Sequence, residues 1–159
     1  MHRYIVFFGL LLLLCSSACR REQFDDQLAF VATTEVPAGL NSLLTHNFPI
    51  TGVRGTTLAL TKARPYQIQL FLEQGEPTFD FVRQAFLLVQ TDSSQVEIAY
   101  NLEHNQDNRS SMVLLPSEID LLPYITQPNF TLLLKLNFHY TTVQTSRIRV
   151  ELGVGVNYD

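Results

Sequence analysis

The sequence contains no tryptophan, and its only two cysteines, Cys15 and Cys19, lie near the N-terminus. Two cysteines placed there exclude a disulfide framework for the rest of the chain. Charged residues are few, at 16%, with 11 basic against 15 acidic residues and no basic stripe, so we do not expect nucleic acid as a partner. The absence of tryptophan also weakens the case for a sugar site, because such sites often use flat exposed rings.

Motifs for catalysis are also missing. The chain has no Gly-x-Ser-x-Gly elbow, no phosphate loop and no glycine-rich dinucleotide turn. His46, His104 and His139 are not spaced as metal ligands, and no cysteine of the folded part could complete a zinc site. The polar segment 103–109 is rich in oxygen ligands but lacks the spacing of a calcium loop, so we interpret it as a solvated hairpin tip. We therefore predict no enzyme activity, no cofactor and no metal.

The one long apolar run, residues 4–14, is 11 residues long. A transmembrane helix needs about 20 such residues, so this run is too short to span a bilayer. His2 and Arg3 precede the run, and the small residues Ser16, Ser17 and Ala18 follow it. That layout predicts a secretory signal peptide over residues 1–18, cut between Ala18 and Cys19.

Ser16-Ser17-Ala18-Cys19 resembles the lipobox of bacterial lipoproteins, although the usual leucine is replaced here by Ser16. The resemblance implies that the Cys19 thiol carries a diacylglycerol, which makes Cys19 the lipidation site and anchors the chain to a membrane. Arg20, where an aspartate would favour the inner membrane, implies the outer membrane of the cell envelope. An ordinary signal-peptidase cut that leaves Cys19 as a free thiol is the alternative. Residues 19–26 then form a tether of at most about 27 Å.

The rest of the chain shows alternation of apolar and polar residues, which is typical of strands with one buried face. The pattern is clearest over 130–141 and 147–158, where the even-numbered residues are apolar. We predict that these two strands form a hairpin with a loop at 142–144. That register places Leu136 opposite Val150 in the core and Lys135 opposite Glu151 on the polar face.

Further segments give an all-β chain of seven to eight strands. Asp92-Ser93-Ser94 turns one strand back onto the next, and Pro49 suggests that its strand lies at a sheet edge. A short helix is expected near 117–125, capped by Ser117 with Glu118 and Asp120 in its first turn. The economical fold is a single antiparallel β-sandwich domain over 27–159, similar to small β-sandwich lipoproteins of the cell envelope, and a closed barrel is the alternative. The other expected strands are 27–35, 44–50, 66–73, 81–91, 95–102 and 111–115, with 56–63 ambiguous.

These observations favour a lipid-anchored, non-enzymatic protein of the outer membrane. We expect it to act as an accessory subunit or a protein-binding module for another envelope protein. An adhesive or glycan-binding module is one alternative, and a pilus-like subunit that donates its C-terminal strand to a neighbour is another. Four tyrosines occupy the apolar positions of the alternation, so we expect them in or beside the core. We expect Tyr124 to be exposed. The four are Tyr66, Tyr100, Tyr140 and Tyr158.

Overall fold

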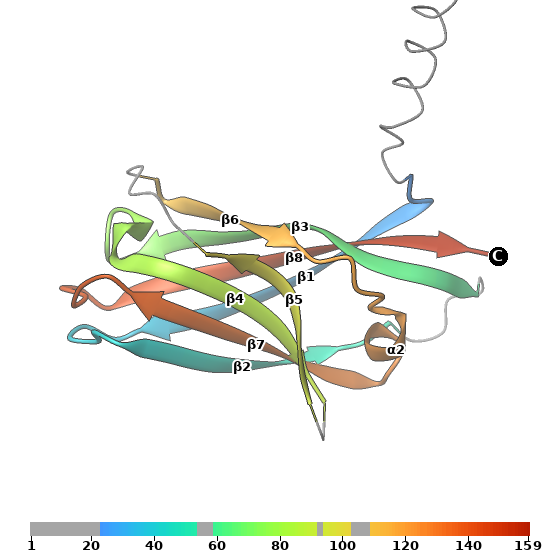
Figure 1. Cartoon of the computed structure of the whole chain (residues 1–159), viewed down its shortest axis with the longest axis horizontal. Coiled ribbons are helices and arrows are strands. Elements are labelled where there is room, and N and C mark those ends of the chain that lie inside the picture. Colours follow the sequence, from blue (N-terminus) through green and yellow to red (C-terminus); the bar gives the residue numbers. More distant parts are fainter. Residues whose placement is uncertain (1–22, 54–58, 92–93, 103–108) are drawn as a thin grey trace, which may run out of the picture.

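The structure is a computed structural model that describes residues 23–53, 59–91, 94–102 and 109–159. Its eight antiparallel strands form one sheet in the order β1-β8-β3-β6-β5-β4-β7-β2 (Figure 1). The prediction of an all-β, antiparallel fold with seven to eight strands is therefore confirmed. The strands are β1 (Asp26–Val36), β2 (Leu43–Thr51), β3 (Leu60–Gln74), β4 (Val82–Gln90), β5 (Gln95–Asn101), β6 (Ser111–Pro116), β7 (Asn129–Phe138) and β8 (Ser146–Tyr158).

The sheet bends at the junction of β5 and β6, where only two residue pairs join the strands: Ala99 with Pro116, and Tyr100 with Leu115. This junction divides the sheet into two four-stranded halves, β1-β8-β3-β6 and β5-β4-β7-β2. β1 and β2 stand at the two ends of the strand order and do not pair with each other. The sheet is therefore nearly closed, with an open seam between these two strands.

The core lies between the halves and is built from the residues that alternation predicts. On β7 and β8 the even-numbered residues from Phe130 to Val156 are buried, while residues such as Lys135 and Arg147 are not. Each fully buried aliphatic side chain contributes roughly 1.5–3 kcal/mol through removal from water. The core also holds two stacked ring pairs, Phe79 with Phe81 and Phe81 with Phe138.

The predicted hairpin between the last two strands is wrong. β7 pairs with β2 and β4, whereas β8 pairs with β1 and β3 in the other half of the sheet. Lys135 donates a hydrogen bond to Oε1 of Gln95 at 2.7 Å, and Glu151 pairs with Arg149 instead. The segment between β7 and β8 therefore crosses from one half to the other. Alternation indicates only which face of a strand is buried. Two strands joined by a crossing connection bury the same faces as two strands joined in a hairpin.

Two of the connections that cross between the halves at one end of the molecule are bonded to each other. They are 37–42, between β1 and β2, and 139–145, between β7 and β8. Thr142 is buried, and its hydroxyl donates to the carbonyl oxygen of Pro37 at 2.8 Å. Its backbone N–H donates to the carbonyl oxygen of Leu40 at 3.0 Å, and its own carbonyl oxygen accepts from the N–H of Gly39 at 2.8 Å. These bonds join the two halves where no strand ladder does.

The helical segment is shorter than expected. It is a single turn, α2 (Leu122–Ile125), and Ser117 does not cap it, because the Ser117 hydroxyl donates to the Glu97 carbonyl oxygen at 3.1 Å. Oδ1 of Asp120 accepts from the N–H of Leu122 at 3.0 Å and from that of Ala63 at 3.2 Å. The bond to Ala63 attaches this segment to β3, so the segment is not a free amphipathic helix.

Other local predictions are confirmed. The chain turns back after β4, since β4 and β5 are antiparallel neighbours. β2, which contains Pro49, is an edge strand, as its proline predicts. None of the helices within 23–53, 59–91, 94–102 and 109–159 has the length and apolar character needed to cross a membrane.

Candidate functional site

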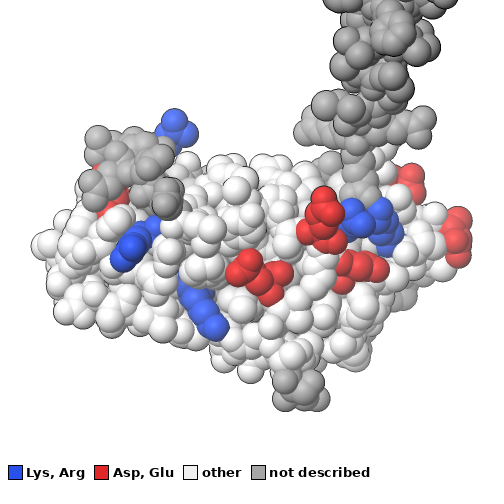
Figure 2. Space-filling model, in the orientation of Figure 1, with Lys and Arg blue, Asp and Glu red and all other residues white. Residues whose placement is uncertain are grey.

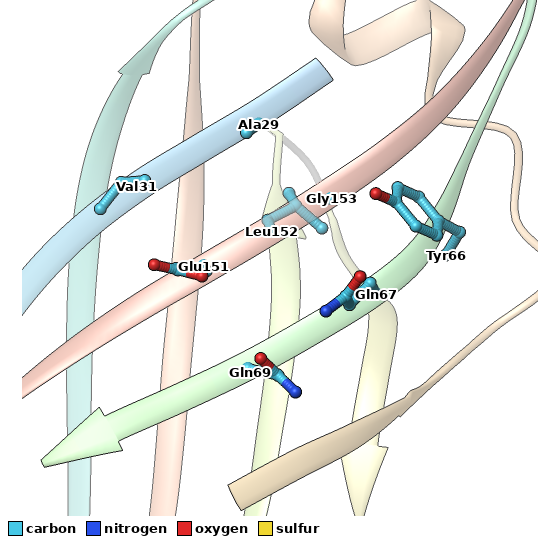
Figure 3. A pocket seen from close by; sticks show the side chains of 8 residues that line it. All are labelled: Ala29, Val31, Tyr66, Gln67, Gln69, Glu151, Leu152 and Gly153. Atoms are coloured by element: carbon cyan, nitrogen blue, oxygen red, sulfur yellow. The ribbon is translucent and has the colours of Figure 1, made fainter. Parts of the chain in front are cut away.

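A shallow groove of about 220 Å³ lies on the outer face of β1, β8 and β3 (Figure 3). Small residues, Ala29 and Gly153, lie beside larger side chains from the two flanking strands. The amides of Gln67 and Gln69 extend from β3, and Val31 lines the groove from β1. The groove is thus built from three strands that are distant in the sequence but adjacent in the sheet.

The aromatic ring of Tyr66 forms one wall of the groove. A register shift between Pro65 and Gln67 in the pairing of β3 with β8 interrupts the alternation of β3. Tyr66 therefore lies on the outer face, beside Gly153, where a Cβ atom would come within 2.8 Å of its Cε1 atom. Gly153 is needed here because the ring occupies the space of a side chain. The predicted core position of Tyr66 is wrong for this reason.

Two contacts from the start of the chain hold the ring. The Tyr66 hydroxyl donates to Oε1 of Gln27 at 2.6 Å, and the Phe24 ring lies 6.2 Å from the Tyr66 ring, centroid to centroid. Phe24 also lies over Gly155, where a Cβ atom would fall 2.2 Å from its Cδ2 atom. The two glycines on the outer face of β8 thus each accommodate an aromatic ring.

The entry of the chain into β1 is held by the C-terminal strand. The Tyr158 hydroxyl donates to Oδ2 of Asp26 at 3.3 Å, and the Tyr158 N–H donates to Oδ2 of Asp25 at 3.1 Å. Burial, together with the negative charges of Asp26 and Asp25, raises the pKa of Tyr158 from its ordinary value. The hydroxyl therefore remains a donor throughout the physiological pH range.

The one carboxylate that lines the groove is paired. Glu151 forms an ion pair with Arg149, whose Nε lies 3.1 Å from Oε1 of Glu73 and whose guanidinium lies 4.6 Å from the centre of the Phe71 ring. The three charged side chains are about one-third exposed, so water screens the ion pairs and each stabilises the fold only slightly. Their effect on the groove is to leave it nearly neutral, with amide donors and acceptors as its main polar groups.

No protein-family model and no curated protein matches this chain. The chemistry of the groove indicates which kinds of ligand would suit it. Uncharged amides, one aromatic ring and a small apolar surface suit a neutral polar ligand with both donors and acceptors, such as a peptide segment or a saccharide. Figure 2 shows the molecule in the orientation of Figure 1: most of the acidic side chains in view gather toward the end at which the C-terminus lies, and much of the remaining surface is uncharged.

The residues selected from the sequence do not come together in this groove. Cys19 and most of the 103–109 segment, including His104, lie outside the described residues. His46 is half-buried on β2 with its ring 4.7 Å from that of Phe48, and His139 is exposed. Within the part of the chain that the structure describes, no three histidine, cysteine or carboxylate side chains are grouped as metal ligands.

Two further tyrosines, Tyr140 and Tyr124, differ in burial from what the sequence predicts. Tyr140 is 46% exposed, although its parity predicts the core, because it lies beyond the end of β7. Tyr124, expected to be exposed, packs against the core from α2. Tyr158 lies at the core edge as predicted. The groove was not predicted, because no signal in the sequence places Tyr66 beside Gly153.

Proposed function

We propose that this protein is a lipid-anchored, non-enzymatic binding module of the outer membrane that serves as an accessory subunit of an envelope assembly. The observation that carries the proposal is the position of Cys19 directly after Ser16-Ser17-Ala18 and seven residues (26 − 19) before β1 begins at Asp26. A cysteine acylated there would hold the sheet within about 25 Å of the membrane surface. Each buried CH₂ of the acyl chains adds about 0.8 kcal/mol of membrane affinity.

The outer surface supports a role in protein binding. Val31, Val113 and Leu115 are each more than half exposed, although they lie in regular strands. The groove adds amide groups that can bond to a peptide backbone beside the apolar Val31. Mixed apolar and amide surfaces of this kind are common where proteins meet. β8 is already paired on both sides within its own chain, so the structure favours this role over that of a pilus-like strand donor.

Replacing Cys19 by serine tests the anchor. We expect the variant to lose the acyl modification and to disappear from the outer-membrane fraction, while its far-UV circular dichroism remains that of a β-protein. Cys15→Ser is the matched control and should leave both the modification and the location unchanged. Mass spectrometry of the mature N-terminus decides the matter, and an unmodified Cys19 in the wild-type protein would refute the proposal.

A glycan-binding function is the second candidate, and the position of Tyr66 favours it. The ring forms a wall of the groove beside the amides of Gln67 and Gln69, an arrangement that offers stacking together with hydrogen bonds to hydroxyl groups. If this function holds, Tyr66→Ala should weaken binding to a soluble envelope polysaccharide at least about tenfold, a loss of about 1.4 kcal/mol. Tyr140→Ala, an exposed tyrosine outside the groove, is the control. Calorimetric titration that finds equal binding by both variants would exclude the groove as a glycan site.

A further inference from the structure

β1 is an edge strand, and its free side faces the open seam next to β2. It pairs with β8 through eleven consecutive residue pairs without a register shift, and no other described strand pairs with it. About half of its backbone N–H and C=O groups therefore point away from the sheet. Natural edge strands are usually blunted by proline, lysine, a bulge or an inward-pointing charge. β1 has no proline, lysine or bulge, and its charged residues, Asp26 and Glu35, stand near its ends.

The side chains along this edge are also incompletely covered. Leu28, Phe30 and Ala32 belong to the inward face but are only half-buried. Val31, on the outward face, is 57% exposed. Thr34 is buried, and its hydroxyl has no hydrogen-bond partner, although it lines the cavity beside the open seam. A backbone laid along β1 would cover the apolar side chains and bring polar groups to this seam.

The sequence of β1 is complementary to itself when two copies run antiparallel. Opposite residues must lie on the same face, so their residue numbers must add to an even sum. A two-fold axis at Val31 (sum 62) pairs all eleven residues of Asp26–Val36. In that register Phe30 lies opposite Ala32, a large side chain beside a small one, and Glu35 lies opposite Gln27.

Neighbouring registers are worse. Moving the axis to Phe30 (sum 60) places Glu35 opposite Asp25, and like charges directly opposite each other are destabilising. Moving it to Ala32 (sum 64) leaves Asp26 and Gln27 without partners in the opposite strand. The axis at Val31 is thus the register that uses the whole strand and places no two acidic residues directly opposite each other.

We propose that two copies of this protein associate through β1, antiparallel about a two-fold axis at Val31, to form one continuous sheet across the dimer. Such an isologous contact is closed, because each β1 edge is used once. The two outer-face grooves then share a border, since Ala29 and Val31 line each groove along the edge that pairs. Dimer formation requires neither the lipid anchor nor a partner protein. Its test is therefore independent of the test of the proposed function.

Cross-linking at the axis tests the register. The full-length chain is prepared in mild detergent with Cys15→Ser and Cys19→Ser, so that an introduced cysteine is the only thiol. Val31→Cys and Val113→Cys then form a matched pair, because both valines lie in strands and are 57% and 55% exposed. With a short bis-maleimide, Val31→Cys should give a covalent dimer at least about tenfold faster than Val113→Cys, since pairing raises the effective concentration of the two thiols. Equal rates would overturn the proposal.

A charge at the edge gives an independent measurement. Ala32→Lys places an ammonium group on the inward side of β1 and should convert the dimer to a monomer in light scattering, whereas Val113→Lys should leave the dimer intact. A wild-type chain that is monomeric, or an Ala32→Lys variant that remains dimeric, would contradict the proposal. If Ala32→Lys loses its cooperative melting transition, the cross-linking comparison alone decides.

Discussion

Replacing Leu136 by alanine lowers the free energy of unfolding by about 2–5 kcal/mol, the range for a fully buried leucine. Leu136 has no exposed surface and lies mid-strand on β7, paired with Leu44 on one side and Ala85 on the other. The loss combines removal of apolar contacts with a cavity that neighbours on both sides cannot fill. Urea denaturation with a constant m-value measures it directly.

Lys135, the residue before Leu136, is the matched control. Its side chain lies on the opposite face of β7 and makes one hydrogen bond to Gln95. Lys135→Ala should therefore cost at most about 1 kcal/mol. If the two variants proved equally damaging, the buried face of β7 would not be the even-numbered one, and the core described above would be incorrect.

Gly75→Ala should lower the free energy of unfolding by about 2–5 kcal/mol. Gly75 directly follows β3 with a φ angle of +95°, and this left-handed backbone costs a non-glycine residue about 1–2 kcal/mol. A Cβ atom there would also lie 2.4 Å from the carbonyl oxygen of Thr145 and 2.5 Å from Cα of Ser146. Such overlap with backbone adds about 1–3 kcal/mol.

Gly39 separates these two contributions. Its φ angle is +83°, close to that of Gly75, but a Cβ atom there meets nothing within 4 Å. Gly39→Ala should therefore cost only the backbone term of about 1–2 kcal/mol. Thermal and urea unfolding of both variants measures the difference, and equal costs would mean that the turn after β3 does not press against the start of β8.

The sequence correctly predicted the features that depend on one strand alone, such as which of its faces is buried. The apolar parity of Leu136 and Val150 places both in the core, and each is buried. Their pairing was predicted wrongly, because alternation reports the face of a strand and carries no information about its neighbour. The crossing connection depends on long-range bonds such as that of Thr142 to Pro37, which no local pattern reveals.

The candidate site shows the same limit. Tyr66 follows the apolar parity of Ile68 and Leu70, and only the register shift beside it turns the ring outward. Neither Pro65 nor Gln67 marks that shift unambiguously, because proline also occurs in unshifted edge strands such as β2. The groove further requires Gly153, nearly ninety residues away, to lie beside Tyr66. A site that depends on one irregularity and one distant pairing cannot be obtained from periodicity.

The position of β8 between β1 and β3 sets the timing of folding. Among the described strands β8 comes latest in the chain, and neither β1 nor β3 can form its long ladder before the thirteen residues of β8 have been made. Sheets dominated by pairings between residues far apart in the sequence fold slowly. The chain loses the entropy of loop closure before it forms the strand contacts that compensate for this loss. The half β1-β8-β3-β6 is consequently the later of the two halves to be completed, because every strand of β5-β4-β7-β2 precedes β8 in the chain.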